Sequence, residues 1–356
     1  MSKIFSRMIK PIKVGRRYIG NNSNCYVIAE IGSNFNGNIS NAKKLIKLAK
    51  ETGANAAKFQ SFVPEKIISK KGFEEKIAFQ KKWKKSVWDT YDESQLPLSW
   101  HKELSKYAKS IGIDFMSTPY YEKAVDELVK LKSPAIKIGS GEITNIEFLK
   151  YVGETQKPIL LATGASTMKE VEDAVNHCMY EGNDKISLLH CIAHYPTDPL
   201  EANLDAINTM REKFRIPIGY SDNGESTLVD LVAVSLGANI IEKHFTLDKT
   251  MSGPDHSFSI DPNGLKNLID QIQNIEKIKG HGKKIPQPTE LEGRYFIRTS
   301  ITANRDLKEG DILTKETLSI KRPAEGIEPK YIEQVIGKKL TKDLKIDEPI
   351  HWNYLF

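Results

Sequence analysis

The sequence contains few cysteines and no long apolar segment, and both absences narrow the class of protein. Its 356 residues include three cysteines, which form no CxxC pair. This sparse set favours reduced thiols in a cytoplasmic protein over a disulfide framework or a zinc finger. No apolar run approaches the ~20 residues of a membrane helix, and the basic N-terminal stretch lacks the apolar core of a signal peptide. We therefore expect a cytoplasmic protein that does not contact a membrane.

Neither basic nor acidic residues are in large excess. The chain carries 52 Lys and Arg residues against 46 Asp and Glu residues, a formal net charge of +6. Nucleic-acid-binding domains usually carry a dense basic patch, so we expect no nucleic-acid partner. The small basic excess is compatible with small anionic substrates. The length favours one large domain with a second, smaller one.

The sequence does contain a regular alternation of short apolar runs and amphipathic helical patterns. The run 26–32 precedes a helical pattern over 40–53, and seven similar pairs follow, ending with a predicted helix over 261–280. Uniform alternation of this kind predicts an α/β protein with a parallel sheet covered by helices. Eight units over about 255 residues indicate a closed (β/α)₈ TIM barrel. A doubly wound open sheet is the alternative, but "EIGSNFNG" after the first strand is not the GxGxxG loop of nucleotide-binding sheets.

Changes in composition and in hydrophobic pattern along the sequence divide the chain into four parts. We expect an N-terminal arm over 1–24, the barrel over 25–280, a Gly/Pro/Lys-containing linker over 281–294 and a small β-rich domain over 295–356. The last part holds the short β-like runs "RTSITA", "DILT", "LSIKRP" and "IGKKL", separated by turn signals.

Polar residues gather where the predicted strands end. In a TIM barrel the chemistry lies at the C-terminal ends of the strands and in the loops after them. The residues at these ends include Glu30, Lys58, Gln60, Thr118, Lys137, Ser140, Glu142, Thr163, Tyr195, Ser221, Asn223, Glu242 and His244. The barrel hypothesis therefore places them around one site.

Lys137 stands out because it lies in an apolar strand that ends in "GSGE". Its ammonium group has three possible roles: an anchor for an anion, a Schiff-base nucleophile, or a structural ion pair with Glu142. The glycines allow the backbone to approach a ligand closely, and exposed N–H groups can bind an anion. Lys58 at a neighbouring strand end favours a cradle for phosphate or carboxylate.

Two further strand-end residues are ambiguous. His244 is either a metal ligand or a hydrogen-bonded core or substrate-binding histidine. We expect Glu242 and His244 to point to opposite sides of their strand, so that one of them faces the barrel. Glu30 is either a general base or the partner of a nearby lysine in an ion pair. Cys191 is interpreted as a small core residue.

The motifs together are more specific than any one of them. "IAEIGSNFNG", "AAKFQ", "MSTPY", "KIGSGE", "LLHCIAHYPT", "IGYSDNG", "IEKHFT", "GPDHSFSIDP" and "IKRPAEGIEP" occur in this order over residues 25–354. This set resembles the bacterial sialic acid synthase family, which makes N-acetylneuraminate, legionaminate and pseudaminate. The resemblance implies a TIM barrel followed by an antifreeze-like (SAF, β-clip) domain. It also implies a domain-swapped homodimer, in which the small domain reaches over the barrel of the partner subunit.

The resemblance implies a transferase that condenses phosphoenolpyruvate with an open-chain N-acyl aminosugar. The acceptor would be N-acetylmannosamine or a 2,4-diacetamido-trideoxyhexose. C3 of phosphoenolpyruvate attacks the sugar aldehyde, water adds at C2, and phosphate leaves with cleavage of the C–O bond. A divalent metal, Mn²⁺ or Mg²⁺, polarises the aldehyde as a Lewis acid.

Roles follow from the matched motifs. The resemblance assigns phosphoenolpyruvate binding to Lys58, Gln60, Thr118, Lys137, Ser140, Thr163 and Ser221. It assigns catalysis to Glu30, Lys58, Lys137 and His244. It assigns metal binding to His244 and Asn223. The sugar contacts are Glu142, Tyr195, Asp255, Phe296 and Arg322, of which the last two belong to the small domain.

The sequence departs from the family pattern at three positions. Asn223 stands where the family usually has a second histidine ligand beside His244, and an amide oxygen is a weaker ligand for a transition metal. His194 and His256 lie in neighbouring loops and are possible replacements. Ala162 and Ala193 replace a serine and an asparagine of a better-studied branch, which favours an acceptor other than N-acetylmannosamine.

Two alternatives to an active nonulosonate synthase follow from these departures. One is a phosphoenolpyruvate-dependent synthase that acts on a different aldose with weaker metal dependence. The other is a catalytically impaired binding homologue, against which the retention of Glu30, Lys58, Lys137 and His244 argues.

Overall fold

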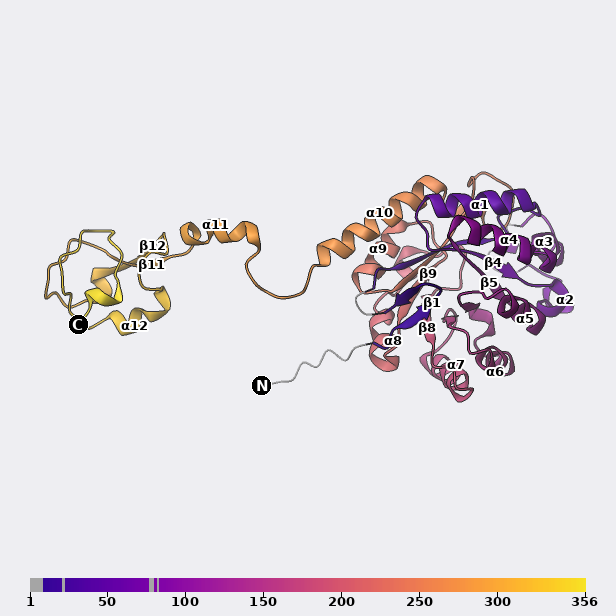
Figure 1. Cartoon of the computed structure of the whole chain (residues 1–356), viewed down its shortest axis with the longest axis horizontal. Coiled ribbons are helices and arrows are strands. Elements are labelled where there is room, and N and C mark those ends of the chain that lie inside the picture. The colour runs from indigo at the N-terminus through magenta and orange to yellow at the C-terminus, as the bar shows by residue number, and fades with distance from the viewer. Residues whose placement is uncertain (1–8, 21–22, 77–79, 82) are drawn as a thin grey trace. The chain divides into compact units, whose positions relative to one another are not determined.

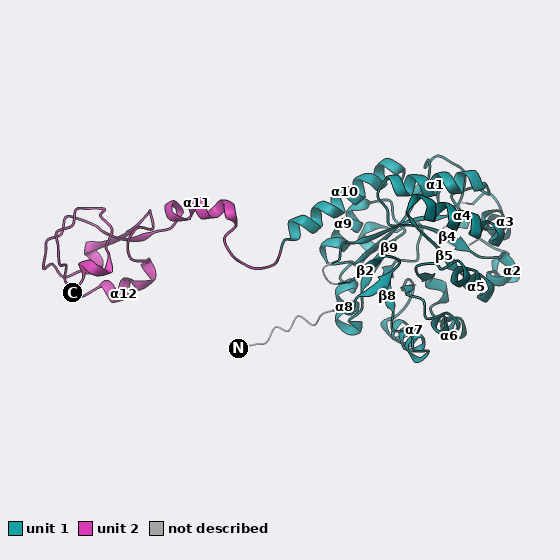
Figure 2. Cartoon of the chain, in the orientation of Figure 1, with its two compact units in different colours: residues 1–280 teal, residues 281–356 magenta. Residues whose placement is uncertain are grey.

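The structure is a computed structural model that describes residues 9–20, 23–76, 80–81 and 83–356 (Figure 1). The chain divides into two compact units, residues 1–280 and 281–356 (Figure 2). Each unit has its own buried apolar cluster, and we describe each by itself.

Unit 1 is built on eight parallel strands. They are hydrogen-bonded in the order β5-β4-β3-β10-β9-β8-β7-β6, and the two end strands, β5 and β6, lie against each other. The sheet therefore forms a nearly closed barrel, and the predicted TIM barrel is confirmed. The strands are β3 (Tyr26–Gly32), β4 (Ala56–Ser61), β5 (Asp114–Pro119), β6 (Ile136–Ile138), β7 (Ile159–Ala162), β8 (Ile186–Cys191), β9 (Ile218–Asp222) and β10 (Ile240–His244).

Helices cover the outside of the barrel (Figure 1). They are α1 (Ile39–Glu51), α4 (Leu98–Ile111), α5 (Glu122–Lys130), α6 (Ile146–Glu154), α7 (Met168–Tyr180), α8 (Ala206–Phe214), α9 (Thr227–Ser235) and α10 (Pro262–Lys279). Their ends follow local sequence signals. Thr167 and Glu170 form a capping box at the start of α7, and the side chain of Asp261 accepts from the N–H of Gly264 at the start of α10.

Shorter helical segments lie in the loops. The long insertion between β4 and α4 contains α2 (Pro64–Ile67), the 3₁₀ turn η1 (Lys71–Phe73) and α3 (Val87–Ser94). Single 3₁₀ turns follow other strands: η3 (Ser140–Glu142), η4 (Pro199–Glu201) and η5 (His256–Phe258). The insertion matters for the site because it adds side chains above the barrel.

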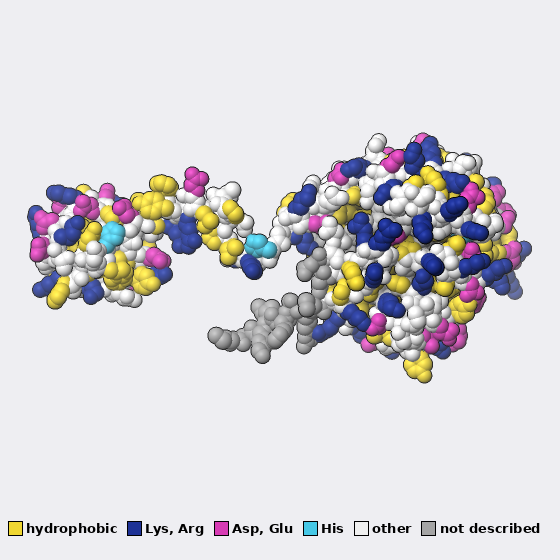
Figure 3. Space-filling view, in the orientation of Figure 1, with side chains coloured by type: hydrophobic (Ala, Val, Ile, Leu, Met, Phe, Trp, Pro, Cys, Tyr) yellow, Lys and Arg dark blue, Asp and Glu magenta, His cyan; other side chains and the backbone are white. Residues whose placement is uncertain are grey.

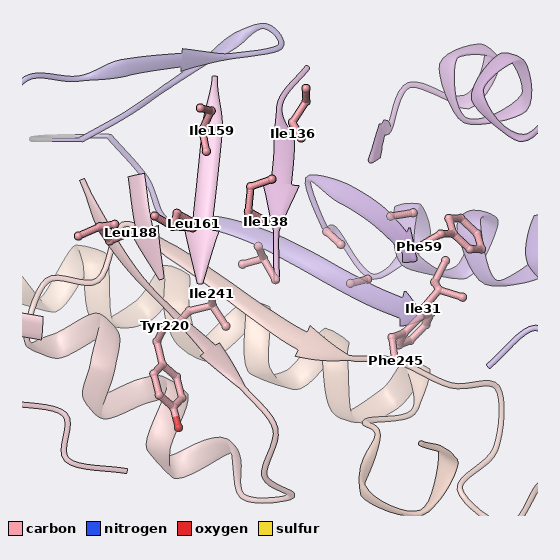
Figure 4. Packing of buried hydrophobic residues seen from close by; sticks show 14 of the residues in the cluster. Ile31, Phe59, Ile136, Ile138, Ile159, Leu161, Leu188, Tyr220, Ile241 and Phe245 are labelled. Atoms are coloured by element: carbon pink, nitrogen blue, oxygen red, sulfur yellow. The ribbon is translucent and has the colours of Figure 1, made fainter. Parts of the chain in front are cut away.

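The main core lies between the strands and their covering helices. Ile136, Ile159 and Leu188, on neighbouring strands, belong to it and are fully buried (Figure 4). Because both faces of a parallel sheet are covered, the strands read as continuous apolar runs. Polar side chains inside these strands are therefore exceptions that need a partner.

A second cluster fills the N-terminal end of the barrel. Part of the predicted N-terminal arm forms an antiparallel hairpin, β1 (Ile12–Val14) and β2 (Arg17–Ile19). Ile12, Val14 and Ile19 pack there with residues such as Tyr26 and Ile240, which are the first residues of their strands. The hairpin thus closes the end of the barrel opposite the site.

Unit 2 contains a helix, a two-stranded antiparallel sheet and several turns. Its elements are α11 (Pro288–Ile297), β11 (Ser300–Ala303), η6 (Lys315–Thr317), β12 (Leu318–Lys321), η7 (Pro329–Tyr331), α12 (Ile332–Val335) and η8 (Trp352–Tyr354). The predicted β-like runs "DILT" and "IGKKL" are joined by an isolated bridge between Ile312 and Lys339. The helix α11 begins inside the segment 281–294, which the sequence predicted as a linker.

The described helices include none that is both long and apolar enough to cross a membrane. On the face of unit 1 drawn in Figure 3, lysine and arginine side chains are interspersed with acidic and apolar ones. The basic excess of the sequence is therefore spread over this face.

Candidate active site

Four buried charged side chains meet inside the C-terminal half of the barrel. Lys58 Nζ lies 2.7 Å from Glu30 Oε2 and 3.7 Å from Glu242 Oε1, and Lys137 Nζ lies 3.6 Å from the same Glu242 oxygen. The strand register explains part of this grouping, because Glu30 of β3 pairs with Lys58 of β4. The two lysines that the sequence singled out therefore share one carboxylate.

The prediction that Glu242 and His244 point to opposite sides is wrong. Side chains two residues apart on a strand point to the same face, and both of these line the barrel interior. Lys243, between them, turns outward and forms ion pairs with Asp222 and Asp230. Sequence reasoning placed Glu242 among the strand-end residues but assigned it no role, although the period of two was sufficient to show that it faces the site together with His244.

The charge states follow from burial and from the partners. For Glu242, burial opposes ionisation, but Lys137 and Lys58 outweigh it and lower the pKa of the carboxyl. For Glu30, burial dominates and raises the pKa in spite of Lys58. For Lys58, the carboxylates of Glu242 and Glu30 outweigh burial and raise the pKa of the ammonium group. Lys58 is therefore a cation, Glu242 an anion, and Glu30 the group of the three best suited to carry a proton.

Hydroxyl groups complete the surroundings of the lysines. Lys58 Nζ donates to Thr118 Oγ1 at 3.0 Å, Ser221 Oγ donates to Glu242 Oε1 at 3.0 Å, and the N–H of Gly164 donates to Ser140 Oγ at 3.0 Å. A Cβ at Gly164 would lie 2.7 Å from Ser140 Oγ and 3.2 Å from the backbone nitrogen of Ala193, so glycine permits this approach without a shift of either neighbour.

These groups line a cavity of about 280 Å³, which we call the lysine cavity. Its lining includes the predicted residues Glu30, Lys58, Gln60, Thr118, Lys137, Ser140, Glu142, Tyr195, Ser221, Asn223 and His244, and also Ala162, Ala193 and Glu242. The structure thus brings together most of the residues that the motifs assigned to phosphoenolpyruvate. A cavity with two buried ammonium groups and several hydroxyls is suited to a small polyanion.

Lys137 is held in place by two contacts. Its Nζ donates to the carbonyl oxygen of Ile138 at 3.2 Å and lies near Glu242. The sequence offered Glu142 as its partner in an ion pair, but the carboxylate within 4.0 Å is that of Glu242.

Thr163 does not join the lysine cavity. Its hydroxyl donates to the carbonyl oxygen of Leu189 at 3.2 Å and approaches Met210 of α8. Ala162, the preceding residue, lines the cavity instead, as the alternation along β7 requires. Thr163 therefore contacts the covering helix layer rather than the cavity.

His244 lies at the rim of the lysine cavity between two aromatic rings. Its ring centroid is 5.8 Å from that of Tyr195 and 5.1 Å from that of Phe258. Its buried Nδ1 has no hydrogen-bond partner and lies 3.8 Å from Asp255 Oδ2. Burial and the positive charge of Lys58 lower the pKa of His244 to about 3, so the ring is neutral and one nitrogen is available to a ligand.

Asn223 and His256, which the sequence also offered as metal ligands, are less suited to bind a metal. The amide nitrogen of Asn223 donates to the carbonyl oxygen of Ile192 at 2.8 Å, which leaves one amide oxygen. His256 uses both ring nitrogens, towards Thr246 and Asn36. In the described part of the chain, no three His, Cys, Asp or Glu side chains are grouped to hold a metal. The residues fit a cation held by His244 with Asp255 and completed by water or substrate, as Mg²⁺ often is.

Two acids at this rim have strongly raised pKa values. Burial, reinforced by the negative charge of Glu30, raises the pKa of Asp255 to about 7. Burial also raises the pKa of Glu142 to about 7, although Lys137 acts in the opposite direction. Both carboxyls can therefore give or take a proton near neutral pH.

A second cavity, of about 140 Å³, adjoins the lysine cavity and shares Gln60, Tyr91, Tyr120, Tyr195 and His244 with it. We call it the aromatic cavity. It is also lined by Phe62 and Trp83, from the insertion after β4, and by Asp255. Sequence reasoning did not find it, because the insertion has no regular pattern.

The two remaining predicted residues belong to unit 2. Phe296, on α11, is 66% exposed, and Arg322, just after β12, is exposed. Their assignment to the sugar stays a prediction.

Comparison with known proteins identifies the family. Residues 45–284 match the model of the NeuB family, and residues 298–355 match that of the SAF domain. The chain belongs to the NeuB family. The predicted family and the predicted SAF domain are both confirmed.

Relatives match the chain over nearly its whole length. N,N'-diacetyllegionaminic acid synthase of Campylobacter jejuni is 42% identical over 329 residues, 91% of this chain and 98% of the relative. The synthase of the same name from Legionella pneumophila is 38% identical, with 94% of this chain and 96% of the relative covered. Among solved structures, N-acetylneuraminic acid synthetase of Leptospira borgpetersenii is 32% identical, with a TM-score of 0.73 over 80% of this chain and 95% of that one.

Proposed function

We propose that the protein is a nonulosonate synthase that condenses phosphoenolpyruvate with an open-chain N-acyl aminosugar and releases phosphate. The observation that carries this proposal is the convergence of Lys58 and Lys137 in the lysine cavity. The names of the NeuB relatives support it, since the curated relatives cited above are synthases of a nonulosonic acid.

Phosphoenolpyruvate binds through its charged groups. Lys58, Lys137 and the hydroxyls of Thr118 and Ser140 surround the space for phosphate and carboxylate. Charge-assisted hydrogen bonds from buried ammonium groups are strong. Glu242 keeps both lysines oriented before the substrate arrives, which preorganises the site.

The reaction requires protons to move at two atoms. When C3 of phosphoenolpyruvate attacks the aldehyde, the aldehyde oxygen takes up a proton. When water adds at C2, that water gives one up before the C–O bond to phosphate breaks. We assign the proton at C2 to Glu30, because burial raises the pKa of this carboxyl and because it contacts Lys58. Because the carboxyl of Asp255 is assigned to the cation, we assign the proton of the aldehyde oxygen to Glu142, which lines the lysine cavity and whose pKa burial raises to about 7.

A divalent cation fits beside His244. The unpartnered Nδ1 of His244 and the carboxyl of Asp255 would hold it, with Asn223 offering at most a neutral oxygen. When bound, such a cation polarises the aldehyde as a Lewis acid. Because the protein offers few ligands, we expect Mg²⁺ or Mn²⁺ to bind weakly.

The test is phosphate release from phosphoenolpyruvate with a panel of N-acyl hexosamines, with and without Mn²⁺. We expect release that requires both substrates and that falls after chelation. No release with any sugar in the presence of metal would refute the synthase proposal. Full activity after chelation would refute the proposed role of the cation but not the proposed synthase activity.

A further inference from the structure

A cavity at the N-terminal end of the barrel collects positive charge. It has a volume of about 520 Å³, and we call it the basic cavity. Its lining includes Asn55 and Asp114, which lie at the starts of β4 and β5, so it is at the end of the barrel opposite the lysine cavity. The lining also includes five cationic side chains, those of Arg16, Arg17, Lys50, Lys109 and Lys132.

The turn of the β1–β2 hairpin holds the two arginines at the cavity. Val14 pairs with Arg17, and Gly15 begins the turn between them with a φ of +58°, as a tight hairpin turn requires. A Cβ at Gly15 would lie 2.8 Å from Asp114 Oδ2. The backbone of the turn therefore rests against this carboxyl group, which fixes the hairpin over the cavity.

The three lysines come from the ends of helices. Lys50 lies in the last turn of α1 and Lys109 in the last turn of α4, and Lys132 follows the end of α5. A basic residue at the C-terminal end of a helix is stabilised by the helix dipole, which accounts for each lysine by itself. It accounts neither for the arginines of the hairpin nor for the gathering of all five cations around one cavity.

The carboxyl group of the cavity does not neutralise these charges. Among the residues that the structure describes, none of the five cations forms an ion pair within 4.0 Å. Asp114 accepts a hydrogen bond of 2.6 Å from the hydroxyl of Tyr26 instead. The nearby Lys157 donates to the carbonyl oxygen of Ser133 in the cavity wall at 3.1 Å. Like charges gathered without counter-ions repel one another, and a bound anion would relieve this repulsion.

We propose that the basic cavity binds a small ligand that carries two or more linked phosphate groups. Its volume of about 520 Å³, against about 280 Å³ for the lysine cavity, admits a ligand larger than a single phosphate. A single phosphate or carboxylate would neutralise one or two of the five charges, whereas linked phosphates bring several negative charges close together. Guanidinium groups bind phosphate oxygens in a bidentate manner, and lysines bind them as point charges.

The test titrates the full chain by calorimetry, without divalent cations, with tripolyphosphate, ATP, AMP and a tetra-aspartate peptide. We expect the Kd of tripolyphosphate to lie at least about tenfold below that of AMP. Tighter binding of ATP than of tripolyphosphate would show that the nucleoside is also bound, and equal or weaker binding would show that the phosphates alone are recognised; both results support the proposal. AMP or the peptide binding as tightly as tripolyphosphate overturns it, as does a failure of tripolyphosphate to bind.

Variants locate the site. Arg16→Gln combined with Lys109→Gln removes a cation from each of two walls and should raise the Kd of tripolyphosphate about tenfold or more. Lys169→Gln combined with Lys266→Gln is the matched control, because these side chains are 74% and 53% exposed on α7 and α10. Equal weakening in the control would show attraction by net charge alone, and weakening in Lys137→Ala would place the ligand in the lysine cavity. Either result overturns the proposal.

Thermal unfolding separates binding from a structural role of the cations. We expect the variant with Arg16→Gln and Lys109→Gln to have an unfolding temperature at or above that of the wild type, because repulsion is relieved, and to gain less on addition of tripolyphosphate. A lower unfolding temperature with unchanged binding would show that the cations only stabilise the fold, and it overturns the proposal. None of these measurements uses phosphoenolpyruvate or an aminosugar, so their outcome is independent of the proposed synthase function.

Discussion

At the scale of single residues, the site depends on how buried charges are compensated. Lys137 occupies an apolar strand because Glu242 and the carbonyl oxygen of Ile138 meet its ammonium group. The sequence identified the lysine but not this carboxylate. A buried charge requires a partner, yet which of several acids supplies it depends on strand directions that only the folded barrel fixes.

Replacement of Lys137 tests the anion site. Lys137→Ala should raise the KM for phosphoenolpyruvate about ten- to hundredfold, because hydrogen bonds to charged groups contribute about 1.5–3 kcal/mol. Steady-state kinetics measure this. Lys130→Ala is the control, since that side chain is 78% exposed on α5. An unaltered KM in Lys137→Ala protein would defeat the role of this lysine.

The pKa of Asp255 leads to a prediction about stability. This carboxyl has a pKa of about 7 in the folded chain against an ordinary value of 3.8. Between these values the folded state holds a proton that the unfolded chain has released. The raised pKa of Asp255 therefore makes its full stabilising contribution to the free energy of unfolding below about pH 4. This contribution is lost as the pH rises through about 7.

Asp255→Asn keeps a neutral side chain at every pH, so its stability should fall less than that of the wild type between pH 5 and pH 8. Urea unfolding at the two values measures the difference. Equal losses in the two proteins would show that Asp255 is ionised throughout.

At the scale of elements, an ion cluster outside the barrel holds the loop after β9. The ammonium group of Lys243 forms ion pairs with Asp222 and Asp230 and donates to the carbonyl oxygen of Gly224 at 2.8 Å. The three charged side chains are at most 1% exposed. The loop that begins here carries Asn223, so the cluster fixes one edge of the lysine cavity.

Loss of Lys243 would leave two buried acids without a cation. Lys243→Met should lower the free energy of unfolding by about 3–5 kcal/mol, measured by urea denaturation. Adding Asp222→Asn and Asp230→Asn to this variant should restore part of the loss. A loss below about 1 kcal/mol for Lys243→Met, the size seen for surface pairs, would show that the cluster is not required.

Most elements of the barrel were predictable, because the periodicity of a strand or a helix is visible within one short stretch of the sequence. The motif order likewise located most residues of the lysine cavity. Thr163 was misplaced relative to the cavity because a side chain at a strand end faces either in or out, and a shift of one residue reverses it. The aromatic cavity and the hairpin β1–β2 arise from packing between distant segments, for which the sequence offers no periodic signal.

At the scale of the whole molecule, the assignment of Phe296 and Arg322 to the sugar requires that unit 2 contributes to a barrel's site, which stays a prediction. The apolar residues of α11 include Leu291, Tyr295 and Phe296, which are 44–66% exposed. The resemblance predicts that the small domain completes the site of the partner subunit.

Mixing two inactive variants tests this prediction. Lys137→Ala disables a barrel and Arg322→Ala disables a small domain. If the small domain serves the partner's barrel, each mixed dimer contains one intact site, and an equal mixture refolded together should recover about a quarter of the wild-type activity. If each small domain serves its own barrel, every site lacks one group and no recovery follows.

The central claim is that phosphoenolpyruvate reacts with an aminosugar by cleavage of its C–O bond. The most direct measurement uses phosphoenolpyruvate labelled with ¹⁸O at the oxygen that bridges carbon and phosphorus. We predict that, with an N-acyl hexosamine and Mn²⁺ present, the label appears in the released phosphate. Phosphate released without the aminosugar, or a label that stays with the organic product, would contradict the account.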